Sequence, residues 1–188
     1  MLGTVAVAAC TQAASVWWTC SNVYAGNDTD KVSGIAYFLT TDMLSYSAAQ
    51  ALAGKGADAL TAALDNVYSF SGSSGGFGTS KTAAIPNSTL GLDDGKTYMA
   101  YLMIFNTSSI TGDSKFYLTE AKELGTMEGA EDISSVKWGS QSTASQAAGA
   151  WSSVKASDPE PPIDSPEPTS GLLMLIGAAG LALRRKRA

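Results

Sequence analysis

Three stretches of the chain are rich in aromatic and branched residues and are bounded by Gly, Asn or Asp, a pattern typical of β-strands. They are SVWWTCSNVYAG (15–26), KVSGIAYFLT (31–40) and KTYMAYLMIF (96–105). Apolar residues occupy both alternating faces of residues 98–105, so we expect a central strand that is covered on both sides. The segment SKFYLTEAKEL (114–124) predicts the next antiparallel strand of a hairpin.

A helical pattern interrupts these strands between residues 47 and 67. Apolar residues recur there largely at steps of three and four, and Ser47 with Gln50 has the spacing of a capping box. Gly54 and Gly56 weaken the middle of the segment. Two short helices and one bent helix are therefore both compatible with the sequence.

The segment 14–156 is predicted to be one mainly β domain, an antiparallel β-sandwich-like fold with one or two short helices inserted. A chain of 188 residues suits one domain plus appendages. Asp93, Asp94 and Gly95 predict a tight turn before the central strand. The stretch 69–81, SFSGSSGGFGTSK, predicts a mobile Gly/Ser loop. Trp138 and Trp151 are expected in weaker strands near the end of the domain.

Composition and charge exclude several classes of activity and of partner. The chain has 17 acidic and 12 basic residues, and four of the basic residues stand together at 184–187. The rest of the chain is therefore strongly acidic, and because such a surface repels phosphate we expect no nucleic acid partner. There is no histidine, which excludes Ser-His-Asp and Cys-His catalysis and His-ligated metal. We expect neither an enzyme nor a cofactor.

The first residues indicate export. Residues 2–9 are uncharged and largely apolar, and small residues follow, as in the h-region and cleavage region of a secretory signal. Thr11, Gln12 and Ala13 form a small-x-small site, so we predict a signal peptide at 1–13 and a mature chain that begins at Ala14. The charged n-region is missing, which indicates an upstream start or a truncated sequence. The alternative is an ordinary first strand over residues 4–18.

The two cysteines leave further alternatives open. VAAC at 7–10 is similar to the lipobox that precedes a lipid-modified cysteine, and would make Cys10 the acceptor. If Cys10 is retained, it can form a bridge with Cys20. If it is removed, Cys20 remains as a lone thiol in an oxidising compartment and should be buried or paired with another chain.

The C-terminal segment has three parts. Residues 157–170 hold five of the six prolines and predict a semi-rigid stalk. Residues 171–183 carry no charge and as a helix reach about 20 Å, short of the roughly 30 Å of hydrocarbon in a bilayer. The preceding stalk and the cations that follow favour a short transmembrane helix with a basic cytoplasmic tail at 184–188; the cations are Arg184, Arg185, Lys186 and Arg187.

Pro166, Glu167 and Pro168, followed by this apolar segment and by RRKR, resemble the PEP-CTERM sorting signal of Gram-negative bacteria. The resemblance covers about 23 of 188 residues. It implies export by the general secretory route, temporary anchoring in the membrane, and removal of the tail by an exosortase, of which this chain is the substrate. Proteins with this signal occur in bacteria that make exopolysaccharide and often reach the envelope or the matrix. We interpret the earlier PEP at 159–161 as part of the stalk.

Candidate binding residues are few. Trp17, Trp18 and Tyr24 could form a platform for sugar rings, although adjacent strand residues point to opposite faces and only one of the two tryptophans can face solvent. A core role is the favoured alternative for them. We interpret other polar clusters as turns, solvated surface or polar loops: the possible calcium dyads Asp28/Asp30 and Asp93/Asp94, the carboxylate pair Glu120/Glu123, the GGFG segment 75–78, and the sequons at Asn27, Asn87 and Asn106.

The sequence thus predicts an exported protein of the cell envelope or extracellular matrix with a structural or adhesive role. One alternative is a carbohydrate-binding module of an exopolysaccharide matrix. A carboxylate-dependent hydrolase is the less favoured alternative.

Overall fold

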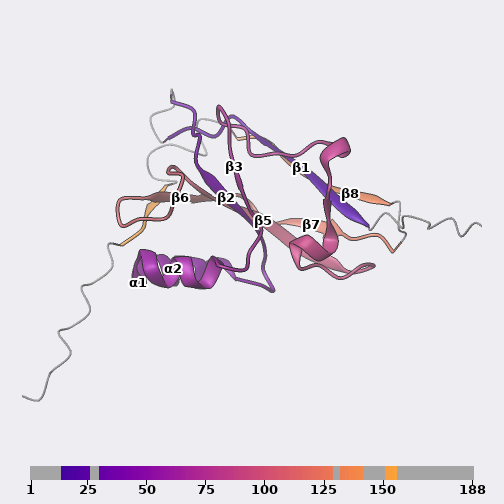
Figure 1. Cartoon of the computed structure of the whole chain (residues 1–188), viewed down its shortest axis with the longest axis horizontal. Coiled ribbons are helices and arrows are strands. Elements are labelled where there is room, and N and C mark those ends of the chain that lie inside the picture. The colour runs from indigo at the N-terminus through magenta and orange to yellow at the C-terminus, as the bar shows by residue number, and fades with distance from the viewer. Residues whose placement is uncertain (1–13, 26–29, 129–131, 142–150, 156–188) are drawn as a thin grey trace, which may run out of the picture. The chain divides into compact units, whose positions relative to one another are not determined.

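The computed structural model describes residues 14–25, 30–128, 132–141 and 151–155. In this part of the chain the fold is mainly β, with two sheets and two short α-helices (Figure 1). Contacts between residues group the chain into Met1–Ser157 and Asp158–Ala188, and every described element belongs to the first group.

The smaller sheet has the order β4-β1-β8. Its strands are β1 (Ser15–Ser21), β4 (Ile85–Pro86) and β8 (Ile133–Ser140). β1 is antiparallel to β4 but parallel to β8, with an irregularity after Thr19. The expectation of a wholly antiparallel fold is therefore wrong at this pair. Parallel neighbours need a long connection, and here almost the whole domain lies between the two strands.

The larger sheet has the order β3-β2-β5-β6-β9, with β7 also paired to β5. Its described strands are β2 (Ile35–Thr40), β3 (Ser69–Ser71), β5 (Thr97–Phe105), β6 (Lys115–Leu118), β7 (Lys122–Gly125) and β9 (Ser152–Ser153). β5 is the central strand, as predicted, with β2 on one side and both β6 and β7 on the other.

The single strand predicted over 114–124 is in fact two strands. Between β6 and β7 the register of pairing with β5 shifts by one residue; at this point the Thr119 backbone N–H donates to the Leu102 carbonyl at 3.0 Å. The Thr119 hydroxyl accepts from the Leu102 N–H at 2.8 Å. The Thr119 hydroxyl oxygen thus accepts the Leu102 N–H in place of a backbone carbonyl, at the junction between β6 and β7.

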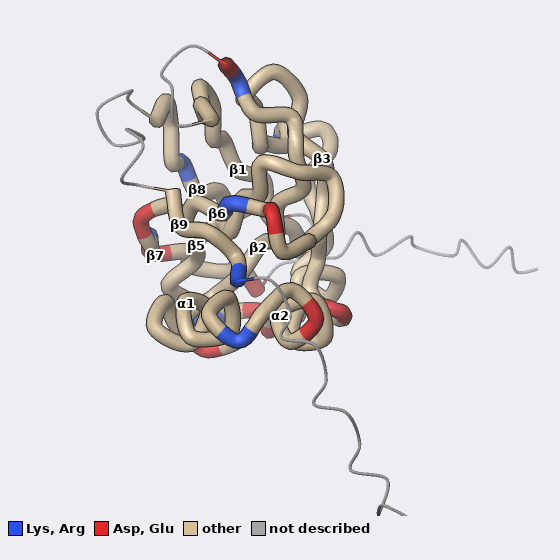
Figure 2. The backbone as a smooth tube through the Cα atoms, turned by 90° about the vertical axis from the view of Figure 1, so that its left-hand side faces the viewer, with Lys and Arg blue, Asp and Glu red and all other residues tan. Residues whose placement is uncertain are grey.

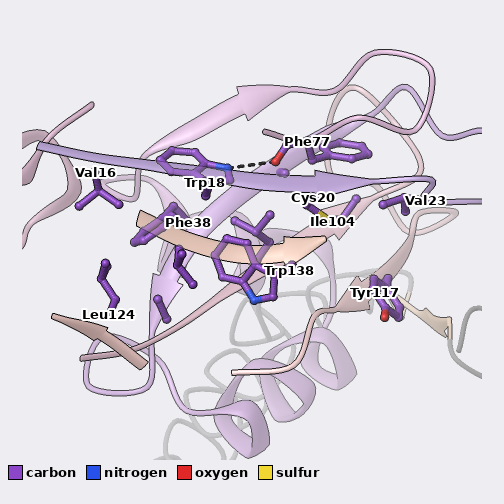
Figure 3. Packing of buried hydrophobic residues seen from close by; sticks show 14 of the residues in the cluster. Val16, Trp18, Cys20, Val23, Phe38, Phe77, Ile104, Tyr117, Leu124 and Trp138 are labelled. Carbon is purple, nitrogen blue, oxygen red and sulfur yellow. Dashed lines mark hydrogen bonds between the residues drawn. The ribbon is translucent and has the colours of Figure 1, made fainter. Parts of the chain in front are cut away.

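One hydrophobic cluster fills the space between the two sheets (Figure 3). Trp18 of β1 is fully buried there, and its indole N–H donates to the Phe77 carbonyl at 3.0 Å. Its ring centroid lies 4.9 Å from that of Phe38 and 5.2 Å from that of Phe70. Inward residues of β5 complete the cluster from the other sheet: Ala100, Leu102 and Ile104.

Two helices cover the opposite face of the larger sheet (Figures 1 and 2). They are α1 (Tyr46–Lys55) and α2 (Ala57–Leu64), separated by Gly56 with φ of 121°. Of the two alternatives that the sequence left open, two short helices and one bent helix, the structure shows the first. The predicted cap is wrong, because α1 begins one residue before Ser47 and the hydroxyl of Ser45 accepts from the Ala48 N–H.

The segment predicted to be a Gly/Ser loop, 69–81, is partly structured. It begins with β3, and Phe77 is fully buried between the sheets. A Cβ atom on Gly72 would lie 2.2 Å from the Phe77 ring, so only glycine fits beside it. The short 3₁₀ helices η1 (Lys81–Ala83) and η2 (Asn87–Leu90) then flank β4.

Candidate functional site

The outward face of β1 and β8 carries one aromatic ring. Trp17 is partly buried in the middle of β1, opposite Ser135 in the parallel register. The Nζ atom of Lys137 lies 5.6 Å from the centroid of the Trp17 ring, within the range of a cation–π interaction. The face around Trp17 is otherwise polar except for the partly buried Ile133 at the start of β8, because strand alternation turns the other bulky apolar residues of the two strands inward.

The three rings predicted to bind a glycan are not equivalent. Trp18 cannot offer a ring face to a ligand, because it is fully buried between the sheets. This removes Trp18 from the predicted platform. Tyr24 lies past the end of β1, where it forms an isolated antiparallel bridge with Lys31. Trp17 is therefore the residue of the predicted set that lies on the outer face of the smaller sheet.

A cavity of about 240 Å³ lies at the start of β1. It is lined by Ala14, Asn87, Ser88, Leu92, Asp93 and Asp94. Asn87 is only 2% exposed, and its side-chain amide N–H donates to Asp94 Oδ1 at 2.7 Å. No group in the described part of the chain donates to Asn87 Oδ1. A buried acceptor without a donor is uncommon and calls for an explanation.

The two carboxylates of the predicted calcium dyad at this cavity have different partners. Asp93 forms an ion pair with Lys96 at 2.5 Å, and the hydrogen bond from Lys96 lowers the pKa of Asp93 and raises that of Lys96. Asp94 accepts from Asn87 instead. No cluster of three or more metal-binding side chains of the His, Cys, Asp or Glu type occurs among the described residues. The other dyad includes Asp28, which lies outside the described residues.

The remaining polar motifs take up structural positions. Glu120 and Glu123 are both exposed, and the backbone carbonyl of Glu120 accepts from the Trp138 indole at 2.7 Å. The GGFG segment turns at Gly75, with φ of 75°, and then runs beside β1, where the Phe77 N–H donates to the Cys20 carbonyl. The sequon at Asn87 is not on an open loop, because the asparagine is buried.

Cys20 is a free thiol in the core between the sheets, with 3% of its surface exposed. Burial raises its pKa to about 12. The thiolate, which is the reactive form, is therefore disfavoured at neutral pH. Cys10, its possible partner, lies outside the described residues.

The predicted sorting motif Pro166, Glu167 and Pro168 also lies outside the described residues, as do the apolar segment 171–183 and the basic residues 184–187. Within the described ranges, none of the helices has the length and apolar character needed to span a bilayer.

Comparison with known proteins adds no assignment. No protein-family model matches the chain, and no significant match was found among curated proteins or among solved structures.

Proposed function

We propose that this chain is an exported protein of the cell envelope or extracellular matrix, held for a time by its C-terminal segment and released when an exosortase removes that segment. The observation that carries the proposal is the order of three signals: Pro166, Glu167 and Pro168, then the uncharged apolar segment 171–183, then RRKR. The basic residues would hold the inner side of the membrane, with the β domain outside.

The architecture of the β domain supports removal of the tail without loss of the fold. Val154 is the last buried residue of the described chain and belongs to the cluster beneath the helices. The next residue, Lys155, donates its backbone N–H to the Ala53 carbonyl at 3.0 Å. The described core therefore ends before the proline-rich segment, and cleavage near residue 166 would leave all of its members in the released protein.

We assign the released domain a structural or adhesive role. Apart from Trp17 and Tyr24, its described aromatic side chains belong to two cores, one on each face of the larger sheet. Its outer surface is acidic and polar, and the sequence has no histidine for acid–base chemistry near neutral pH.

Two matched PEP sequences allow a sharp test. In a bacterial host that carries an exosortase, the variant with Pro166→Ala and Pro168→Ala should stay membrane-bound and keep its full tail. The control with Pro159→Ala and Pro161→Ala removes the same residue types seven positions upstream and should be processed like the parent chain. Fractionation and intact-mass analysis of each protein report location and both termini.

The proposal fails if the parent chain is recovered with an intact tail from cells that have an active exosortase. It also fails if both PEP variants are processed equally well, because the motif at 166–168 would then have no role.

A carbohydrate-binding module is the second candidate function, and the position of Trp17 favours it. The ring lies on the outer, mainly polar face of the smaller sheet, where a pyranose could stack if Lys137 moved aside. Binding to the exopolysaccharide of the host should then be lost in Trp17→Ala and kept in Tyr24→Ala. Equal binding by the parent and by Trp17→Ala would exclude this platform.

A further inference from the structure

The cavity at the start of β1 is built around Ala14 and Asn87. β1 and β4 pair Ser15 with Pro86 and Val16 with Ile85, so the same register places Ala14 opposite Asn87. The Asn87 backbone N–H donates to the Ala14 carbonyl at 2.9 Å, which continues the ladder by one residue. In a hydrogen-bonded antiparallel pair, the N–H and C=O of one residue both point at the other. The Ala14 N–H is therefore directed toward the backbone carbonyl of Asn87, and both residues line the cavity.

The side chain of Asn87 leaves one acceptor unused. Its amide N–H is engaged by Asp94 Oδ1, which fixes the orientation of the amide, because the reversed amide would set two oxygens against each other. Asn87 Oδ1 is then a buried acceptor to which no described group donates. The missing partner must be a donor, and the Asp94 carboxylate on the same cavity wall favours a donor with positive charge.

The other charges near this cavity do not supply that donor. Lys96 is committed to Asp93. The Glu128 side chain lies beside Gly95 and is acidic, so it supplies no positive donor. On the side of β8, the Asp132 carbonyl accepts from the Ser15 N–H. Apart from the paired Lys96, the groups around the cavity are acidic or neutral.

We propose that the free α-ammonium group of Ala14, created by cleavage after Ala13, binds in this cavity, donating to Asn87 Oδ1 and forming an ion pair with Asp94. Hydrolysis of the peptide bond between Ala13 and Ala14 consumes one water and gives the Ala13 carboxylate and the Ala14 amine, which takes up a proton. An amide nitrogen with one N–H becomes an ammonium with three donors. This inference rests on the proposed export, because export supplies the cleavage.

The consequence is a domain whose first strand, already paired with β4 and β8, gains an additional contact after processing. In the uncleaved chain the Ala14 nitrogen is a neutral amide and cannot pair with Asp94 as a cation. In the mature chain the start of β1 is tied to η2 and to the turn at Asp94. The ordinary pKa of an α-amino group is about 7.7 to 8.0, and an ion pair with a carboxylate raises it. The added stability is thus complete below about pH 7.7 and is lost as the pH rises through the raised value.

Two chains that differ by one residue test the proposal. One begins at Ala14 and the other at Ala13, and both run to Ala188 in detergent. Each is made with an initiator methionine, which is removed before a small residue. An extra residue carries the ammonium about 3.3 Å along the strand. Competitive acetylation followed by mass spectrometry should give an α-amino pKa about one unit higher, or tenfold tighter proton binding, in the chain that begins at Ala14.

Substitutions at the two adjacent acids provide matched controls. Asp94→Asn in the Ala14 chain should return the pKa of the α-amino group to the value of the Ala13 chain. Asp93→Asn, which removes the partner of Lys96, should keep most of the shift. Circular dichroism shows whether each variant is folded. Equal α-amino pKa values in the Ala14 and Ala13 chains, or a shift that survives Asp94→Asn, would overturn the proposal.

Two further results separate this proposal from the proposed function. If CaCl₂ raises the unfolding temperature of the Ala14 chain and EDTA reverses the effect, the cavity holds a metal ion and the proposal is wrong. N-terminal sequencing of the exported protein should give Ala14, and another first residue would overturn it as well. A protein that begins at Ala14 but keeps its tail would contradict only the release by an exosortase.

Discussion

The two faces of β5 are equally buried but are covered in different ways. Ala100, Leu102 and Ile104 face the smaller sheet, whose contribution is dominated by large rings such as Trp18 and Trp138. The next residues along the same strand face two short helices, which contribute mainly Ala and Leu side chains: Ala49, Ala53, Ala57, Leu60 and Leu64. One strand therefore separates two cores of different construction.

The difference lies in what holds each cover in place. The smaller sheet is tied by backbone bonds between segments that are distant in sequence, such as β1 with β8. The helices are ten and eight residues long, shorter than a helix that is stable alone in water. They depend on packing against the sheet, and a few bonds such as that from the Tyr101 hydroxyl to the Leu44 carbonyl fix the connecting loop. We therefore expect the core between the sheets to tolerate a cavity less well than the core beneath the helices.

The largest effect is predicted for Trp18→Ala. The change opens a cavity between two hydrogen-bonded sheets and removes the donor to the Phe77 carbonyl, so the free energy of unfolding should fall by about 4 kcal/mol. Urea unfolding followed by circular dichroism measures it. Trp17→Ala is the matched control. It loses a partly exposed ring and its contact with Lys137, and should cost about 1 kcal/mol or less. Equal losses would contradict the inward placement of Trp18.

The pattern of the sequence could predict the strand that both cores share. The apolar run at 98–105 has no polar face, and a strand of that kind is stable only when both sides are covered. The same pattern could not predict which elements cover the two faces of this strand. Nothing local indicates that β1 pairs with β8 in parallel, because that contact joins the two ends of the domain. Nor does a glycine or proline mark the break at Thr119, where a hydroxyl group takes over a backbone bond.

The candidate sites, like the fold, could be predicted only in part from the sequence. Alternation along β1 predicts that one of Trp17 and Trp18 faces solvent, but an aromatic ring suits either side, and the position of the larger sheet decides which is buried. The burial of Asn87 gave no signal, because Asn-Ser-Thr after a proline is typical of an exposed turn. Its role depends on Ala14, more than seventy residues earlier in the chain.

The core beneath the helices should respond less strongly, and Leu60→Ala tests this. Leu60 of α2 is fully buried, so the free energy of unfolding should fall by about 2 to 3 kcal/mol, because a short helix can shift toward the sheet and close part of the cavity. Leu52→Ala on α1, where the side chain is only partly buried, should cost less. A loss for Leu60→Ala as large as that for Trp18→Ala would mean that the helices are held as firmly as the sheet.

The smallest effect is predicted for the N-cap of α1, which stabilises the helix separately from its packing against the sheet. Ser45→Ala removes the hydroxyl that accepts from the Ala48 N–H at the start of α1, and should lower the free energy of unfolding by about 1 kcal/mol. Ser47→Ala is the matched control, since Ser47 is exposed within the first turn, is not the N-cap of the helix, and its hydroxyl lies 3.2 Å from that of Ser45. Its removal should change the stability by less than about 0.5 kcal/mol.

If Ser47→Ala proved the costlier change, α1 would begin at the capping box that the sequence predicts. If neither change had an effect, the N-terminal turn of α1 would be held by its contacts with the sheet alone. The two cores would then differ in their side chains but not in how their covers are secured.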